Sequence, residues 1–278
     1  MSATCDVCWH HCHLKDGQVG ACHARVGTGQ AVVSKGYGKL TSVAVDPIEK
    51  KPLARFLSGT SVLSLGGFGC NLHCPWCQNH TISQVGEEGV GWRESDAEGI
   101  RALAVELHER DVRMCGVAYT YNEPLVSYEY VRDCARLVHE SGLVNVLVSA
   151  GSVSEHVARE VAPLMDAANI DLKSSSAETY ARIGGDLGQV QSTISCLHEA
   201  GCHVEVTTLV VPGVNDTEEE IAAIASWIAG LDPSICYHVT RFFGAYRMRD
   251  VPATPRETVF TLARVARRYL SDVVVGNV

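Results

Sequence analysis

Short apolar runs alternate with longer stretches of helical periodicity from about Ser61 to the end of the chain. Six of the runs are apolar in character on both faces, which is typical of parallel strands covered by helices. They span Ser61–Leu65, Met114–Tyr119, Val144–Ser149, Ala167–Asp171, His203–Val210 and Tyr237–Phe242. The pattern predicts six strand–helix units in succession.

Helix-start signals occupy several of the segments between these runs. Ser95 and Thr217 each stand three residues before a glutamate, which is the pattern of a capping box at a helix start. Further helices are expected over Leu125–Glu140 and Val190–Ala200.

Six units are fewer than the eight that close a full barrel. We therefore predict an α/β fold built as a partial, open (β/α)6 TIM-like barrel over residues 61–278, with a doubly wound open sheet as the alternative. Both architectures place their chemistry at the carboxyl ends of the strands. Candidate functional residues should therefore follow the predicted strands.

Residues 1–60 do not continue the strand–helix pattern. They contain four cysteines, a glycine-rich stretch and the charged run Asp46–Pro52. We predict a small cysteine-rich, metal-binding N-terminal extension over residues 1–60, packed on the barrel. The charged run has no assigned role: it either lines the barrel mouth or forms a solvated turn.

Composition narrows the class of protein. Hydrophobic residues make up 46% and charged residues 20% of the chain, which indicates a globular protein with a core. The net charge of −9 disfavours nucleic-acid binding through phosphate contacts. No apolar run approaches the ~20 residues that span a bilayer, and the N-terminus has no secretory pattern, so we expect a cytoplasmic protein without a membrane partner.

In that reducing compartment, twelve cysteines indicate metal binding or redox chemistry rather than disulfides. Five of them stand alone within apolar stretches and are expected to be buried structural thiols. These are Cys115, Cys134, Cys196, Cys202 and Cys236.

Three cysteines follow the first predicted strand in a compact group. Cys70, Cys74 and Cys77 have the spacing C-x3-C-x2-C, directly after the glycine-rich turn Gly66–Gly69. Three thiolates can bind three irons of a cubane cluster and leave the fourth iron open for a ligand. The alternative is a zinc site with His73 or His80 as the fourth ligand.

With Trp76 beside the last cysteine, this motif resembles the signature of the radical S-adenosylmethionine (SAM) superfamily. The resemblance implies a [4Fe-4S] cluster whose open iron binds SAM through its amino and carboxylate groups. It also implies reductive cleavage of SAM to methionine and a 5′-deoxyadenosyl radical that abstracts hydrogen from a substrate. Such chemistry is anaerobic and needs a low-potential reductant such as flavodoxin or ferredoxin.

Later motifs resemble those of pyruvate formate-lyase activating enzymes. Asn122 and Glu123 stand where the family usually has a Gly-Gly-Glu-Pro turn, which implies a grip on the SAM amino group. Asp171 and Lys173 resemble a SAM-facing pair of the family. The residues that the resemblance places at SAM are Trp76, Asn122, Glu123, Ser149, Asp171, Lys173, Thr207, Leu209 and His238.

These later residues also have structural explanations. Glu123 fits the end of a Glu-Pro turn, Asp171 with Lys173 fits a surface ion pair, and His238 fits a hydrogen-bonded histidine on a strand. Some relatives carry an arginine in place of Thr207, so a charged contact to SAM is lost there.

The N-terminal cysteines Cys5, Cys8, Cys12 and Cys22 allow two metal sites. Four thiolates form either a closed tetrahedral zinc site, which would stabilise a segment too small for its own core, or a second iron–sulfur cluster that passes electrons or binds substrate. Zinc is slightly favoured by the sequence.

Nearly the whole chain resembles the radical SAM enzyme of the AmmeMemoRadiSam system. Two departures stand out: Arg55 precedes Phe56 where that subgroup commonly has histidine, and the sequence ends at Val278 where many members continue.

We therefore predict a radical SAM oxidoreductase whose target resembles that of a glycyl-radical activase, with a glycyl-radical protein as partner. The alternatives are radical modification of a small molecule, nucleotide or protein side chain, a non-catalytic iron–sulfur electron carrier, and a zinc-binding interaction protein.

Overall fold

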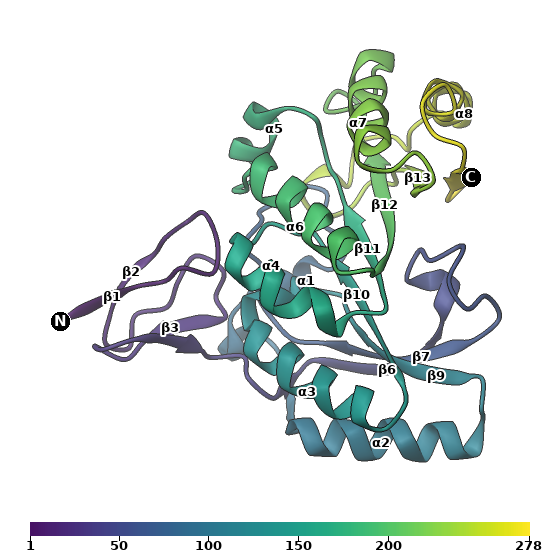
Figure 1. Cartoon of the computed structure of the whole chain (residues 1–278). Helices are drawn as coiled ribbons and strands as arrows, with labels where there is room; N and C mark the ends of the chain where they lie inside the picture. The colour runs from purple at the N-terminus through teal and green to yellow at the C-terminus, as the bar shows by residue number, and fades with distance from the viewer.

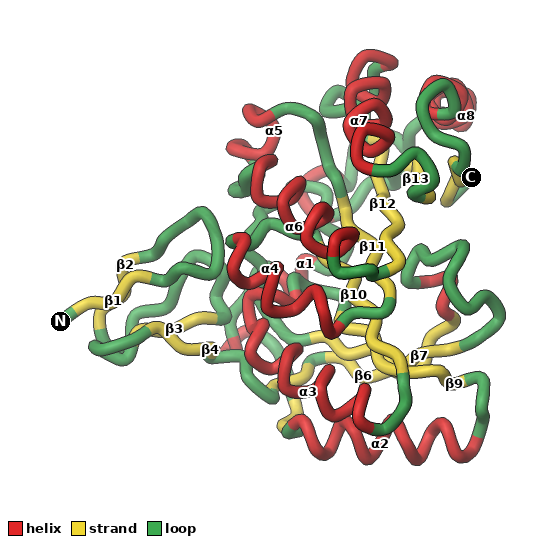
Figure 2. The backbone as a smooth tube through the Cα atoms, in the orientation of Figure 1, coloured by secondary structure: helices red, strands yellow, loops and turns green.

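A computed structural model describes all residues, 1–278, and is built around one eight-stranded sheet (Figures 1 and 2). The strand order across the sheet is β14-β13-β12-β11-β10-β9-β7-β6. The strands are β6 (Ser42–Pro47), β7 (Ser61–Gly66), β9 (Met114–Tyr119), β10 (Val144–Ser149), β11 (Ala167–Asp171), β12 (His203–Val210), β13 (Cys236–Arg241) and β14 (Val273–Gly276).

The order of these strands identifies the architecture. From β7 to β14 all neighbours are parallel and follow one another in chain order, so every crossover steps in the same direction. A doubly wound sheet reverses its strand order at a switch point. Strands β6 and β14 form the two free edges, so the sheet curves without closing. The partial barrel is confirmed, and the doubly wound alternative is wrong.

Two strands of the sheet were not expected from the sequence. β14 adds a seventh parallel strand next to β13, and β6 pairs antiparallel with β7. The six expected strands are all present, four with the predicted bounds and the first and last shifted by one residue. β6 was missed because its last residues, Asp46 and Pro47, belong to a charged, proline-containing run that is atypical of strands.

Helices cover the outer face of the curved sheet (Figure 2). They are α2 (Ala97–Arg110), α3 (Tyr128–Glu140), α4 (Glu155–Val161), α5 (Ala177–Arg182), α6 (Leu187–Glu199), α7 (Glu218–Leu231) and α8 (Arg256–Ala266), with the short α1 (His80–Ser83) after the central cysteines. The largest of three apolar clusters, with 56 buried residues, fills the space between the helices and the sheet. The inner face is left to line a cavity.

Helix caps partly follow the sequence signals. Thr217 caps α7 by accepting a hydrogen bond from the Glu220 backbone at 3.2 Å, as expected. At α2 the cap is Asp96 rather than Ser95, and its carboxylate accepts from the Gly99 backbone at 2.8 Å. Asp is as good an N-cap as Ser, so neighbouring candidates cannot be ranked by sequence.

The N-terminal residues form a lobe of two short hairpins, seen in purple beside the barrel in Figure 1. They are β1 (Ser2–Thr4) with β2 (His13–Lys15), and β3 (Arg25–Gly27) with β4 (Val32–Ser34). Buried Arg25 ties the lobe to α3 through two hydrogen bonds to Glu129, at 2.8 and 2.9 Å. The domain boundary at residue 60 stays a prediction. Strand β6 lies within residues 1–60 but belongs to the main sheet and not to the lobe.

None of the helices combines the length and apolar character that crossing a lipid bilayer requires.

We expect Gly116→Ala to destabilise the sheet strongly. A Cβ at Gly116 in β9 would lie 1.9 Å from the carbonyl oxygen of Val144 in β10, so the two strands would have to separate. Overpacking of this kind costs about 1–3 kcal/mol or more in the free energy of unfolding. Gly230→Ala in α7, where a Cβ meets nothing within 4 Å, is the control and should stabilise by up to about 1 kcal/mol. Equal denaturation midpoints for the two variants would contradict this account of the β9–β10 contact.

Candidate active site

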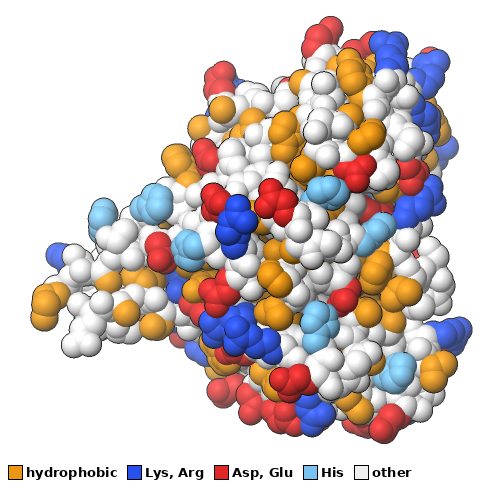
Figure 3. Space-filling view, in the orientation of Figure 1, with side chains coloured by type: hydrophobic (Ala, Val, Ile, Leu, Met, Phe, Trp, Pro, Cys, Tyr) orange, Lys and Arg blue, Asp and Glu red, His pale blue; other side chains and the backbone are white.

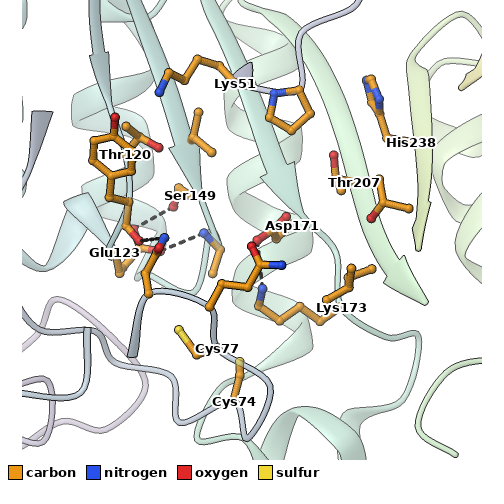
Figure 4. Close-up of a pocket in the computed structure, with 18 of the residues that line it drawn as sticks. Lys51, Cys74, Cys77, Thr120, Glu123, Ser149, Asp171, Lys173, Thr207 and His238 are labelled. Carbon is orange, nitrogen blue, oxygen red and sulfur yellow. Dashed lines mark hydrogen bonds and ion pairs between the residues drawn. The ribbon is translucent and has the colours of Figure 1, made fainter. Parts of the chain in front are cut away.

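One cavity of about 730 Å³ occupies the inside of the barrel, mainly toward the carboxyl ends of the strands (Figure 4). Its lining includes the three central cysteines and all nine residues that the sequence placed at SAM. These are Cys70, Cys74, Cys77, Trp76, Asn122, Glu123, Ser149, Asp171, Lys173, Thr207, Leu209 and His238. Parallel strands in sequential order bring their ends to the same side, and this is why residues spread over so much of the sequence meet here.

The cysteine loop is held by the turn that follows β9. The Asn122 amide accepts a hydrogen bond from the Gly67 backbone at 3.0 Å and donates to the carbonyls of Phe68 and Gly69, at 3.1 and 2.9 Å. Gly69 has a positive φ of 80°, which L-residues with side chains rarely adopt. Asn122 thus positions the loop that leads into Cys70.

Burial raises the pKa of two of the three thiols, Cys70 and Cys74. It raises the pKa of Cys74 to about 11 and that of Cys70 well above its usual range. A metal that binds here has to displace protons from the thiols, which makes its affinity depend on pH.

Glu123 is a buried carboxylate next to this loop. Its oxygens accept hydrogen bonds from Ser149 Oγ at 2.7 Å, from the Ala150 backbone at 2.8 Å and from the Leu125 backbone at 3.0 Å. A carboxylate has about four acceptor positions, so one stays free toward the cavity. Burial raises the pKa of Glu123, although these donors and the nearby Lys173 lower it in part.

Lys173 supplies a positive charge to the same cavity. Its Nζ lies 3.0 Å from Asp171 Oδ2. Burial alone would lower the pKa of Lys173, but Asp171 and Cys74 raise it above its usual range, so the ammonium stays charged. Asp171 and Lys173 are an ion pair, as the structural explanation held, and the pair lines the cavity rather than standing apart from it.

Strands β12 and β13 provide the opposite wall. Thr207 Oγ1 is buried and has no hydrogen-bond partner, so it can serve a polar group in the cavity. His238 is already engaged, because its Nε2 lies 2.5 Å from Glu205 Oε2.

Sequence reasoning missed Glu205, which closes the end of the barrel away from the cysteines. Its carboxylate accepts from the backbones of Ala54 and Arg55, at 2.9 and 2.8 Å, and pairs with the rings of His203 and His238. With Cys236 and His238 it forms a group of three metal-ligand types within 4.8 Å. Its acceptor positions are already filled by four donors, so we assign it an anchoring role beneath the cavity.

Lys51, with Asp46 and Tyr121, is the second group that sequence reasoning left without a role. Lys51 lines the cavity at the end opposite Cys74 and Cys77 (Figure 4). Its Nζ lies 2.8 Å from Asp46 Oδ2 and 4.7 Å from the centre of the Tyr121 ring, and the Tyr121 hydroxyl donates to the same carboxylate at 2.5 Å.

The buried charges of this group shift one another. Burial lowers the pKa of Lys51, and Asp46 offsets this only in part. Burial would raise the pKa of Asp46, but the hydrogen bonds from Lys51 and Tyr121 lower it to about 2. The charged run Asp46–Pro52 was recognisable in the sequence. Nothing in the neighbouring sequence indicated that its Lys51 lines the cavity of the barrel.

The four N-terminal cysteines lie in the lobe, outside the cavity, and all twelve thiols of the chain are free. Cys5, Cys8 and Cys22 are buried, and Cys12 is partly exposed.

The residues of the cavity fit an iron–sulfur cluster with bound SAM. Three thiols without a fourth cysteine line one end, next to a free carboxylate position on Glu123 and the ammonium of Lys173. The histidines of the zinc alternative have other partners: His73 Nδ1 lies 3.0 Å from Gln84 Oε1, and the His80 ring stacks on Tyr246. Neither histidine lines the cavity.

The amino-acid sequence is similar to those of several known proteins. The chain is 36% identical over 99% of its length to an uncharacterized protein of Methanocaldococcus jannaschii, covering 81% of that protein. It is 26% identical over 60% of its length to 7-carboxy-7-deazaguanine synthase of Thermococcus kodakarensis, covering 70% of that enzyme. It is also 26% identical over 59% of its length to the benzylsuccinate synthase activating enzyme of Thauera aromatica, covering 54% of that enzyme.

The fold is shared with solved structures as well. A radical SAM methyltransferase from Sphaerobacter thermophilus superposes with a TM-score of 0.58 at 15% identity, over 78% of this chain and 66% of the other. The narrower resemblance to the AmmeMemoRadiSam enzyme stays a prediction. The family model described as the Radical SAM superfamily matches residues 65–228, more than half of the sequence, and the chain therefore belongs to the radical SAM superfamily.

Proposed function

We propose that this chain is an enzyme that binds a [4Fe-4S] cluster through Cys70, Cys74 and Cys77 and uses it to cleave SAM reductively. The cluster with SAM supplies the 5′-deoxyadenosyl radical, which abstracts hydrogen from a substrate. The observation that carries the proposal is the convergence of three thiols, a buried carboxylate and the partly buried ammonium of Lys173 on one cavity.

The protein groups have complementary tasks at this site. Lys173 offers a charge-assisted hydrogen bond to the SAM carboxylate, and the free acceptor position of Glu123 faces its ammonium. Asn122 holds the cysteine loop, and Thr207 Oγ1 is an unpartnered hydroxyl for a polar group of SAM or substrate.

A non-catalytic electron carrier is a poorer explanation. A carrier normally ligates its cluster with four cysteines and needs no large polar cavity beside it.

We include a one-electron reductant such as flavodoxin or ferredoxin, and a cytoplasmic location, in the proposal.

The first test is anaerobic SAM cleavage. After reconstitution with iron and sulfide, and with dithionite as reductant, the wild type should release 5′-deoxyadenosine. The triple variant Cys70/Cys74/Cys77→Ala should release none, because its thiolates no longer hold the cluster. The control is Cys115→Ala with Cys196→Ala, which removes thiols outside the cavity. No product from a wild type that retains its cluster would refute SAM cleavage.

Asn122→Ala should weaken the cysteine loop. It leaves the Gly67 N–H and the Phe68 and Gly69 carbonyls without their partner, at a cost of about 1–3 kcal/mol. We expect faster loss of iron from the reconstituted protein, measured with a ferrous chelator. Gln78→Ala, at another residue lining the cavity, is the control and should lose iron at the wild-type rate. Equal rates for Asn122→Ala and wild type would contradict its positioning role.

The target of the radical has two candidate classes. Similarity to an enzyme named for activating benzylsuccinate synthase supports a glycyl-radical activase-like role with a protein partner. Similarity to a 7-carboxy-7-deazaguanine synthase supports radical chemistry on another target.

A specific feature of the cavity favours a small molecule. The Lys51 side chain is only 3% exposed, and its ammonium makes one hydrogen bond, to Asp46, and lies over the Tyr121 ring, so it has no second oxygen acceptor. A glycyl loop of a partner protein has no charge to match this ammonium. A substrate with a carboxylate does, and it would occupy the cavity between Lys51 and the cluster.

Lys51→Met tests this second class. The probe is the dialysable fraction of a cell extract, added to the anaerobic assay in a dilution series and compared with the protein fraction. We expect the dialysable fraction to stimulate 5′-deoxyadenosine release by the wild type. For Lys51→Met the half-stimulating concentration should rise about tenfold or more, because a charged hydrogen bond is lost.

Lys50→Met is the matched control, since the Lys50 side chain is 69% exposed and lies 3.8 Å from the same Asp46. It should respond as the wild type does. Stimulation by the protein fraction alone, with no effect of Lys51→Met, would instead favour the activase-like role.

A further inference from the structure

The N-terminal lobe brings four thiols against the cysteine loop of the barrel. The thiols of Cys5, Cys8, Cys12 and Cys22 are electrostatic neighbours of one another. The loop between β1 and β2 is folded around them by hydrogen bonds from the Cys5 backbone to Cys12 and from the His11 backbone to Cys8, at 2.9 and 3.2 Å. This arrangement gathers four potential metal ligands in one small lobe.

The spacing of the thiols decides between the two metal sites that the sequence allows. A tetrahedral zinc with Zn–S bonds of 2.3 Å requires its sulfurs to lie about 3.8 Å apart. No three of the four N-terminal thiols lie within 4.8 Å of one another. The ligand atoms of Glu205, Cys236 and His238 do meet that limit. In a cubane each thiolate binds a different iron, so the sulfurs stand farther apart. Cys70, Cys74 and Cys77 do not form a group within 4.8 Å either.

A buried donor faces the same pocket. Arg25 is 4% exposed, and its positive charge lies beside the thiols of Cys5 and Cys22. Its terminal nitrogens bind Glu129, Val126 and Val32, but its Nε has no partner. A buried N–H without an acceptor calls for a ligand, and N–H donors to sulfur are a means by which proteins tune iron–sulfur clusters.

The pocket adjoins the catalytic loop directly. The Asn71 side chain faces the Cys8 thiol, and the Asn71 carbonyl lies 2.9 Å from His10 Nε2. A Cβ on Gly69 would lie 2.2 Å from the carbonyl oxygen of Cys22, so the lobe packs on the residue that precedes Cys70. Figure 3 shows the lobe projecting from the barrel, with histidine side chains on the visible surface.

We propose that Cys5, Cys8, Cys12 and Cys22 hold a second four-iron cluster, which relays electrons to the cluster at Cys70, Cys74 and Cys77. In each transfer the N-terminal cluster loses one electron and the catalytic cluster gains one. A one-electron protein reductant of the flavodoxin or ferredoxin class then restores the N-terminal cluster. The metal content is independent of the proposed function, whereas the relay rests on it.

Metal analysis of the full-length protein tests the site. After anaerobic reconstitution in the presence of both iron and zinc, the wild type should contain about eight irons, in two four-iron clusters. The Cys70/Cys74/Cys77→Ala variant leaves the lobe intact and should retain about four irons and no zinc. About one zinc per chain, or no metal, in that variant overturns the proposal. This result is readable even if SAM is never cleaved.

The relay is tested with Cys8→Ala combined with Cys22→Ala. Dithionite is small enough to reduce the catalytic cluster directly, whereas a flavodoxin docks on the surface. The ratio of flavodoxin-driven to dithionite-driven 5′-deoxyadenosine release should fall in the double variant.

Arg25→Lys, which keeps the charge but removes the Nε donor, should retain the iron and shift the reduction potential of the N-terminal cluster. An unchanged ratio overturns the relay, and an unchanged potential overturns the role of Arg25.

Discussion

Hydrogen bonds from two adjacent side chains, Asn122 and Glu123, join the strand ends on which the site depends. Asn122 holds the Gly67–Gly69 backbone after β7, and Glu123 holds Ser149 and Ala150 at the end of β10. Both residues belong to the turn after β9, which lies between those strands in the sheet. A buried carboxylate is tolerated only when it is hydrogen-bonded, and these donors meet that condition while leaving one acceptor position toward the cavity.

The two ends of the cavity differ in what they can recognise. The cysteine end presents thiols together with Lys173 and Glu123, a set suited to a metal cluster and a zwitterionic ligand. The other end is closed by Glu205, which fixes the Ala54–Arg55 backbone beneath the barrel and so carries Lys51 into the interior. The cavity is therefore polar at both ends. This suits a cosubstrate at the cysteine end and a second, smaller polar molecule at the Lys51 end.

The N-terminal lobe is held against the barrel at two points. Arg25 links it to α3, and the contact of Cys22 with Gly69 links it to the cysteine loop. A glycine at position 69 meets two demands at once, a positive φ and the close approach of another backbone. A lobe held at both points keeps a fixed distance between the two groups of cysteines, as a short electron path requires.

The sequence by itself determined the elements and ligands whose signal is local. Strand periodicity lies within each run, and C-x3-C-x2-C places three thiols on one loop, so both were predicted together with the partial barrel. The tertiary structure alone decided the contacts between residues far apart in the chain: Lys51 with Tyr121, Glu205 with Ala54, and Arg25 with Glu129. Such pairs leave no pattern in the sequence, because a buried charge is recognised only by the partner that folding brings to it.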